Sequence, residues 1–203
     1  METFQQLRNN SSPEVVHDKD FIVVYRALDA TLCKAIIDVF DQDKSKWRGK
    51  IGRSDGVSHQ EETKSSWDLE ITNEGDWENI FQKIHPPIQT CVTDYLARSP
   101  ILKSFPLLAT GYKIQMYPKQ QGYFRWHADS LGRNARNRVA AMVLYLNDVE
   151  QGGETEFFHQ HIKIAPKAGY LVMFPAGWNY MHCGHVPESN DKYIISLFIK
   201  IND

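Results

Sequence analysis

The sequence predicts an α+β, mostly β fold: a double-sheet jelly roll supported by helices from the first half of the chain. Two observations predict it. Apolar residues recur at helical spacing in the first half, and from Thr110 onward short β-rich segments follow one another, broken by Gly, Pro and Asn. Closely spaced strands after a helical half are typical of a jelly roll with supporting helices. With 203 residues and 42% hydrophobic content, the chain can bury one substantial core.

The beginning of the chain is predicted to contain a leader, a strand and a helix. Residues 1–18 are polar and are expected to form a flexible leader, with residues 19–203 forming a single domain. Residues 21–25 are a short β-rich run. Asp29 then offers an N-cap for a helix that continues to about Phe40, with an apolar stripe along one face.

Three further segments complete the first half. Residues 41–65 show no periodicity and are expected to form a long exposed loop. Because such loops are often functional, this one is a candidate lid over a substrate, with a simple insertion as the alternative. Residues 67–71 alternate as a strand does. Residues 76–97 have helical spacing, and the pair Pro86-Pro87 must kink that helix or split it in two.

The second half is predicted to be almost entirely strands. No internal repeat, low-complexity segment or natural domain boundary interrupts it. The expected strands cover residues 110–117, 123–129, 139–147, 154–158, 161–164, 170–174 and 192–201.

Composition narrows the class of protein. The net charge is −2 and charged residues make up 24%, so neither a nucleic-acid-binding surface nor disorder is expected. Cys33, Cys91 and Cys183 are widely spaced and odd in number, as in a reduced intracellular protein. The polar N-terminus lacks a signal peptide's apolar core, and no apolar run could cross a bilayer. The chain is expected to be cytoplasmic, without a membrane partner, and its oligomeric state stays open.

His127 and Asp129 are the first candidate site residues. They lie two positions apart in a predicted strand, so both side chains point to one face. One imidazole nitrogen and one carboxylate oxygen suit a divalent metal such as ferrous iron. A second histidine would complete a two-histidine, one-carboxylate site with open coordination positions.

Four downstream histidines are candidates for that third ligand: His159, His161, His182 and His185. His159 and His161 would share one face of a strand, where we expect a solvent-facing pair. His182 is followed ten residues later by Lys192, which opens an apolar strand. A cation at the mouth of a β-barrel beside a metal would suit a carboxylate co-substrate, although a solvated lysine at a strand end is the alternative.

These residues resemble the ferrous iron and 2-oxoglutarate-dependent dioxygenases, and within them the prolyl 4-hydroxylase-like branch. The likeness covers most of the chain from about Asp20 and is dense from Ile114 to the end. Six matching pieces occur in the family's order and spacing: His127-Ala128-Asp129, residues 143–148, Gly152-Gly153-Glu154-Thr155, residues 166–169, Phe174-Pro175, and His182-Cys183-Gly184 followed by Lys192. The family's fold is a double-stranded β-helix, the cupin-like jelly roll.

The resemblance implies a role for each matching residue. His127, Asp129 and His182 would be the iron ligands and catalytic centre. Four further residues would bind 2-oxoglutarate, with Lys192 and Tyr145 at its distal carboxylate: Lys192, Tyr145, Tyr117 and Ser196. Arg138 would lie at the substrate mouth, although Arg133 and Arg136 are near it in sequence. The cofactors implied are Fe(II), with 2-oxoglutarate and dioxygen as co-substrates, and ascorbate as a further candidate.

One departure concerns the third ligand. The family usually has proline four residues after the distal histidine, whereas Pro187 is five residues after His182. His185 is therefore a competing third ligand. The ten-residue distance from His182 to Lys192 and the glycine at 184 favour His182.

The activity implied by the resemblance is 2-oxoglutarate-dependent hydroxylation of prolyl residues in a peptide or protein, coupled to formation of succinate and CO2. Hydroxylation of a free amino acid or another small molecule is the alternative with the same chemistry. A non-catalytic jelly-roll binding or sensor module is the alternative from a different class. No expected metal ligand is missing from the sequence, which favours an enzyme.

Overall fold

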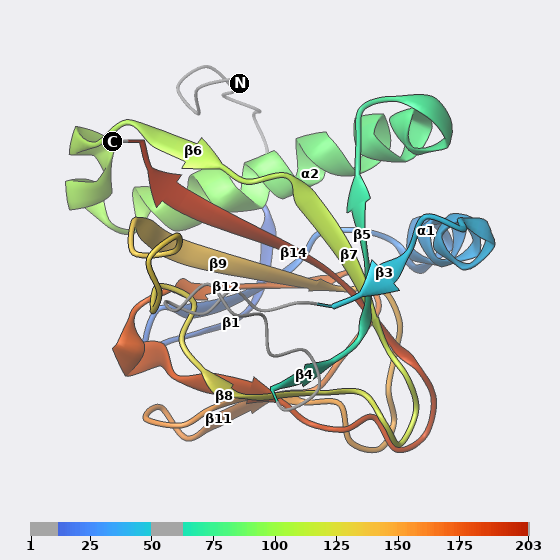
Figure 1. The fold of residues 1–203 in the computed structure, drawn as a ribbon. Helices are drawn as coiled ribbons and strands as arrows, with labels where there is room; N and C mark the ends of the chain where they lie inside the picture. The colour runs from blue at the N-terminus through green and yellow to red at the C-terminus, as the bar shows by residue number, and fades with distance from the viewer. Residues whose placement is uncertain (1–11, 50–62, 203) are drawn as a thin grey trace.

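The computed structural model describes residues 12–49 and 63–202, which form two β-sheets with antiparallel pairing (Figure 1). The larger sheet has nine strands. Eight follow the order β1 (Glu14–Lys19), β2 (Ile22–Arg26), β12 (Tyr170–Pro175), β9 (Arg138–Tyr145), β14 (Lys192–Ile201), β7 (Tyr112–Tyr117), β5 (Trp67–Ile71) and β3 (Trp47–Arg48), and β6 (Leu107–Ala109) also pairs with β14.

The smaller sheet has five strands and lies against the inner face of the larger one. Its order is β11 (Ile162–Ile164), β10 (Thr155–Phe157), β13 (His182–Gly184), β8 (Tyr123–His127) and β4 (Lys64–Ser65). Chain order and sheet order differ because, from β7 to β14, the chain passes back and forth between the two sheets, with β10 and β11 consecutive in the smaller one. That alternation is the double-stranded β-helix, so the predicted jelly roll is confirmed.

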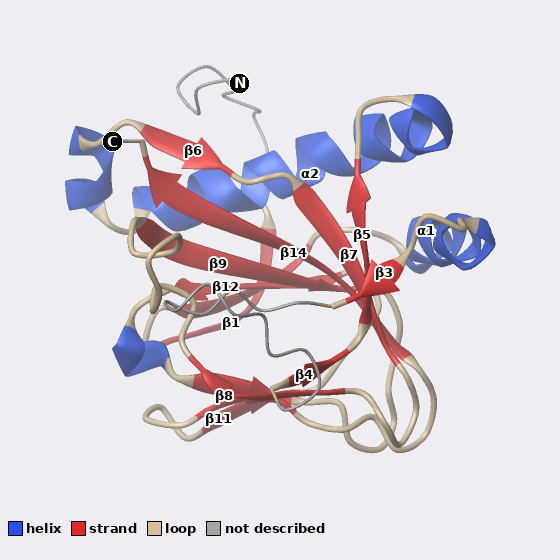
Figure 2. Cartoon of the chain, in the orientation of Figure 1, coloured by secondary structure: helices blue, strands red, loops and turns tan. Residues whose placement is uncertain are grey.

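Helices support the larger sheet. The long helices are α1 (Ala30–Gln42) and α2 (Glu78–Ala97), and the short 3₁₀ helices are η1 (Gly75–Trp77), η2 (Pro100–Ser104) and η3 (Trp178–Tyr180). Figure 2 shows α2 above the larger sheet and the smaller sheet below it. None of the described helices is long and apolar enough to cross a membrane.

Two apolar clusters fill the layers, because successive residues of a strand point to opposite faces. In β2, Val23 and Tyr25 pack with α1 and α2, whereas Ile22 and Val24 pack between the two sheets. The helices therefore hold the larger sheet from one side and leave its other face to the smaller sheet.

The expected elements of the first half are mostly present. Asp29 caps α1 and accepts a hydrogen bond from the main-chain nitrogen of Leu32 at 2.8 Å, as predicted. The expected strand over residues 67–71 is β5. The second helix is continuous, so the predicted split does not occur. Pro86 and Pro87 lie outside the buried face of α2. Because proline has no N–H group, the carbonyl four residues earlier loses its helical hydrogen bond, and on this side of the helix that carbonyl can bond to water instead.

Two predictions of chain organisation need correction. Residues 14–18, placed in the flexible leader, belong to β1, which pairs with β2 over the register Glu14–Arg26 to Lys19–Ile22. The polar composition of β1 misled the prediction, because an edge strand with mostly exposed side chains carries few apolar residues. In addition, β13, which contains His182, lies in a segment for which no strand was expected.

The predicted loop over residues 41–65 is shorter than expected at both ends. The helix α1 continues to Gln42, and β3 and β4 occupy two short parts of the segment. Residues 50–62, the central part of the predicted lid, lie outside the described residues. The hypothesis therefore stays a prediction.

Candidate active site

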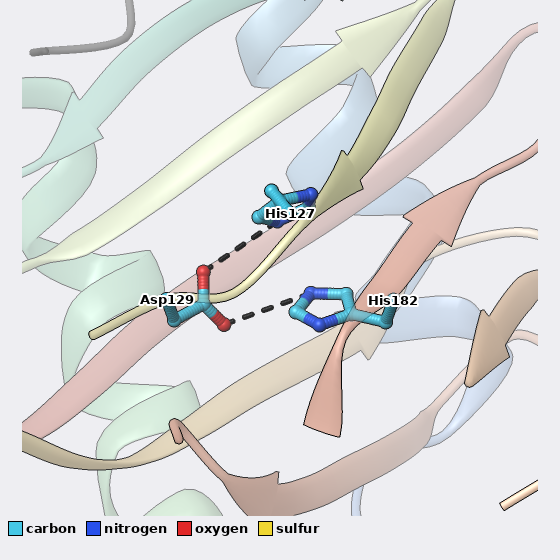
Figure 3. Close-up of side chains that lie close together, drawn as sticks. All are labelled: His127, Asp129 and His182. Carbon is cyan, nitrogen blue, oxygen red and sulfur yellow. Dashed lines mark ion pairs between the residues drawn. The ribbon is translucent and has the colours of Figure 1, made fainter. Parts of the chain in front are cut away.

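Three potential metal ligands meet at the inner face of the smaller sheet. His127 ends β8, and His182 begins β13 directly across from it in the register of the two strands. The Asp129 carboxylate lies between the two imidazoles, with Oδ1 3.6 Å from His127 Nε2 and Oδ2 3.6 Å from His182 Nε2 (Figure 3). Strand pairing thus assembles one group from two distant parts of the sequence.

Main-chain hydrogen bonds orient both imidazoles. Nδ1 of His127 donates to the carbonyl of Arg125 at 2.7 Å, and Nδ1 of His182 donates to the carbonyl of Tyr180 at 2.9 Å. Because a carbonyl oxygen can only accept, Nδ1 carries the proton and Nε2 keeps its lone pair. Metal-binding histidines are commonly held in this way. The donor set and its orientation therefore fit a ferrous ion.

The local electrostatics also favour a cation. Burial, and then the neighbouring His127, lower the pKa of His182 to about 4, so its ring is neutral at pH 7. Burial raises the pKa of Asp129, but His182, His127 and Arg138 outweigh that effect, and the net pKa lies below its usual value. Neutral imidazole and ionised carboxylate are the forms that bind a metal.

The other candidate histidines lie elsewhere. His185 Nε2 is 2.6 Å from Glu156 Oε2, away from the His127–Asp129–His182 group. His159 and His161 are both exposed, as expected. They lie in the turn between β10 and β11, however, not on one face of a strand.

The His-Asp-His group lines a cavity of about 710 Å³ between the two sheets. The same cavity is lined by four of the other predicted site residues: Tyr117, Arg138, Lys192 and Ser196. Arg138 is fixed at its wall, since Nη1 donates to the main-chain oxygen of Asp129 at 3.2 Å and the guanidinium lies 3.7 Å from the centre of the Phe198 ring.

Lys192 is a buried cation, not a solvated lysine at a strand end. It is 4% exposed, and its ammonium donates to the main-chain oxygen of Gly153 at 2.6 Å. Burial lowers the pKa of Lys192 to about 8. Within the described residues the ammonium forms no ion pair. A buried charge without a counter-ion is costly, so this position is suited to an anionic ligand.

Tyr145 lies behind the cavity wall. It is fully buried, and its hydroxyl donates to Thr155 Oγ1 at 2.7 Å. Thr155 does line the cavity. Tyr145 itself does not line the cavity, so its hydroxyl is directed to Thr155 and not into the cavity.

Sequence reasoning missed a second buried lysine at the cavity. Lys64 pairs with Asp68, at 2.8 Å from Nζ to Oδ2, and Ser66 Oγ donates to Asp68 Oδ1 at 2.6 Å. Its ammonium also lies 5.8 Å from the centre of the Tyr117 ring. The sequence signal that could have found Lys64 is the alternation of polar residues at positions 64, 66 and 68, with Trp67 on the other face of the chain. Lys64 has its counter-ion, in contrast to Lys192.

A row of exposed aromatic residues begins at the cavity wall. Trp126 lines the cavity, is 42% exposed and packs edge-on against Phe158 at 5.5 Å between ring centres. Phe158 contacts His159, and His159 contacts Trp178, which is 68% exposed. We call these four residues the aromatic ridge.

A jelly roll that holds two oriented histidines, a carboxylate and a buried cation without an ion-pair partner among the described residues suits a mononuclear metal ion and an anionic ligand in one cavity. Residues 112–200 match the family model of the 2OG-Fe(II) oxygenase superfamily, and this range contains all four of those residues. No curated protein sequence matches the chain.

Three solved structures are similar in fold. A viral collagen prolyl hydroxylase from Paramecium Bursaria Chlorella virus-1, in its 2OG complex, matches with a TM-score of 0.65 and 19% identity over 92% of this chain and 99% of that one. A prolyl hydroxylase from Trichoplax adhaerens, in complex with a hypoxia inducible factor peptide fragment, matches with a TM-score of 0.73 and 17% identity, over 90% of this chain and 84% of that one. A Pseudomonas putida prolyl-4-hydroxylase matches with a TM-score of 0.63 and 18% identity, over 88% of this chain and 90% of that one.

Residues 112–200 are therefore similar to the 2OG-Fe(II) oxygenase superfamily, and the chain shares its fold with prolyl hydroxylases.

Proposed function

We propose that this chain is a non-haem Fe(II)- and 2-oxoglutarate-dependent dioxygenase that hydroxylates prolyl residues within a peptide or protein and converts 2-oxoglutarate to succinate and CO2 in the same cycle. The observation that carries the proposal is the unpaired ammonium of Lys192 in the cavity that also holds the His-Asp-His group. The fold shared with prolyl hydroxylases, one of them bound to a peptide, supports the substrate class.

In this proposal His127, Asp129 and His182 hold ferrous iron. The iron, together with bound 2-oxoglutarate, supplies the activation of dioxygen. The protein orients both imidazoles, with Nε2 toward the Asp129 carboxylate, through the hydrogen bonds from Nδ1 to main-chain carbonyls.

The co-substrate's distal carboxylate pairs with Lys192. Gly153 takes one of the three ammonium hydrogens, which leaves two for an anion. The Thr155 hydroxyl, held by Tyr145, is a second donor. Tyr117 forms the aromatic wall beside Lys192, and Ser196 adds a hydroxyl on the same strand.

The substrate chain binds at Arg138 and along the aromatic ridge. The guanidinium of Arg138 is fixed at the cavity wall, where its remaining N–H groups can donate to a peptide carbonyl. Exposed aromatic rings such as Trp126 and Trp178 suit the flat faces of proline rings in an extended segment.

The test is incubation of the full chain with ferrous iron, 2-oxoglutarate and ascorbate, against a library of proline-containing peptides and a set of free amino acids. Mass spectrometry should find peptides heavier by one oxygen atom and an equal amount of succinate. His127→Ala and Asp129→Ala should abolish both products. Products from free amino acids alone would replace the peptidyl assignment with the small-molecule one. Absence of succinate under every condition would favour the non-catalytic module.

A further inference from the structure

A second group of potential metal ligands lies on the outer face of the smaller sheet. The group consists of Glu156, Cys183 and His185, each with a ligand atom within 4.8 Å of the other two. His185 Nε2 lies 2.6 Å from Glu156 Oε2 and 3.8 Å from Cys183 Sγ. None of the three has a role in the proposed oxygenase chemistry.

Strand geometry places the group back to back with the active site. Cys183 follows His182 in β13, so their side chains point to opposite faces. Glu156 and Cys183 are direct partners in the register of β10 and β13. The main-chain nitrogen of His185 donates to the oxygen of Glu154 at 2.9 Å, which extends that pairing past the end of β13. The three donors thus lie on a rigid paired backbone.

The chemistry of the donors points to zinc. A thiol, an imidazole and a carboxylate are the three side chains that zinc uses in proteins, and a site with three protein ligands keeps a fourth position for water. A surface hollow lined by Cys183, Gly184 and His185 gives an ion access from solvent. We propose that Glu156, Cys183 and His185 form a second metal site, selective for zinc-like ions.

Binding requires three small rearrangements. Lys163 Nζ lies 3.1 Å from the same Glu156 oxygen and must move away, which is easy because its side chain is 58% exposed. The ion then replaces that ammonium as the partner of Glu156. The Cys183 thiol loses its proton to solvent as the metal–sulfur bond forms, and the proton with which His185 Nε2 donates to Glu156 moves to Nδ1, which frees the Nε2 lone pair for the ion. An ion in this position links β10 to β13 directly behind His182.

The test is a titration of the full chain, preloaded with ferrous iron and 2-oxoglutarate without oxygen, with Cd²⁺ as the probe. Only a metal–thiolate bond gives the ultraviolet thiolate-to-cadmium absorption, and the His-Asp-His group has no sulfur. We expect a stoichiometric band, one ion per chain, that Zn²⁺ suppresses. Cys183→Ser should remove it, whereas Cys91→Ser, at a cysteine buried in the helix-side core, should keep it.

Two conservative variants separate a built site from a single thiol. Glu156→Gln and His185→Gln should each weaken Cd²⁺ affinity by at least about tenfold. Lys163→Ala should strengthen it by removing the competing ammonium. The circular dichroism spectrum of each variant checks that it folds. A band that survives Cys183→Ser, its absence in the unmodified chain, or unchanged affinity in the Gln variants would each overturn the proposal. None of these results affects the proposed oxygenase activity, which is measured by succinate.

Discussion

Lys192 Nζ lies 5.7 Å from the centre of the Tyr117 ring, and these two residues are direct partners in the pairing of β14 with β7. The first residue of one strand and the last residue of the other therefore form one wall of the cavity. The aromatic face stabilises the ammonium but cannot neutralise it. Within the described residues the Lys192 ammonium has no carboxylate partner. A variant of Lys192 is therefore the most direct test of the proposed function.

Lys192→Ala should raise the KM for 2-oxoglutarate by roughly 30-fold or more, because a buried carboxylate would lose its charge partner. The rate of succinate formation at varied 2-oxoglutarate measures it. Lys200→Ala, at the other end of β14, is the matched control and should leave the KM unchanged. An unchanged KM in Lys192→Ala would mean that another residue anchors the co-substrate.

The KM for 2-oxoglutarate should depend on pH. Burial lowers the pKa of Lys192 to about 8, and only the protonated ammonium attracts the carboxylate. The KM should therefore be flat below pH 8 and rise above it, by up to about tenfold per pH unit. Lys192→Arg keeps its charge and should remove this rise. A rise of the same size in the arginine variant would assign the titration to another group.

Iron binding should distinguish the two histidines of the 182–185 segment. His182→Ala should weaken ferrous iron binding by more than about 100-fold, since a ligand contributes more than the groups that orient it. His185→Ala should leave it nearly unchanged, because His185 bonds to Glu156 on the other face. Equilibrium dialysis without oxygen measures both. The reverse pattern would reassign the third ligand.

Lys64→Met should destabilise the fold by about 3–5 kcal/mol, because Asp68 would remain buried without its partner. Urea denaturation monitored by tryptophan fluorescence measures the free energy of unfolding. The double variant Lys64→Met with Asp68→Leu should recover much of the loss, since it removes both charges. A double variant as unstable as the single one would show that the cost lies in packing.

Trp178→Ala should raise the KM for a peptide substrate by roughly fivefold, the effect of losing about 1 kcal/mol of contact. Turnover of 2-oxoglutarate without a peptide should not change, because the aromatic ridge lies outside the co-substrate positions. Phe105→Ala, at an exposed aromatic residue outside the ridge, is the control. Equal effects of both variants would argue against a substrate role for the ridge.

The sequence by itself determined most of the elements, although not β1 or β13, and indicated the local metal pair. The alternation of apolar residues located the strands of the jelly roll, because side chains in a strand point alternately to its two faces. The same alternation predicted His127 and Asp129 on one face of a strand over residues 123–129, but β8 ends at His127 and Asp129 lies in the following turn, from which its carboxylate still reaches His127. The apolar run after Lys192 placed this lysine at the start of a strand, but it left open whether the ammonium is buried or solvated. These are short-range properties, and they need no knowledge of the partner strands.

Only the tertiary structure decided which distant residues meet. The register of β13 against β8 puts His182 opposite His127, and a shift by one residue would have turned His182 outward. In the packed structure, Tyr145 lies behind Thr155. Lys64 pairs with the Asp68 carboxylate, whereas Lys192 has no such partner among the described residues. Such outcomes depend on strand pairing and layer packing between residues far apart in the chain, and local spacing carries no information about either.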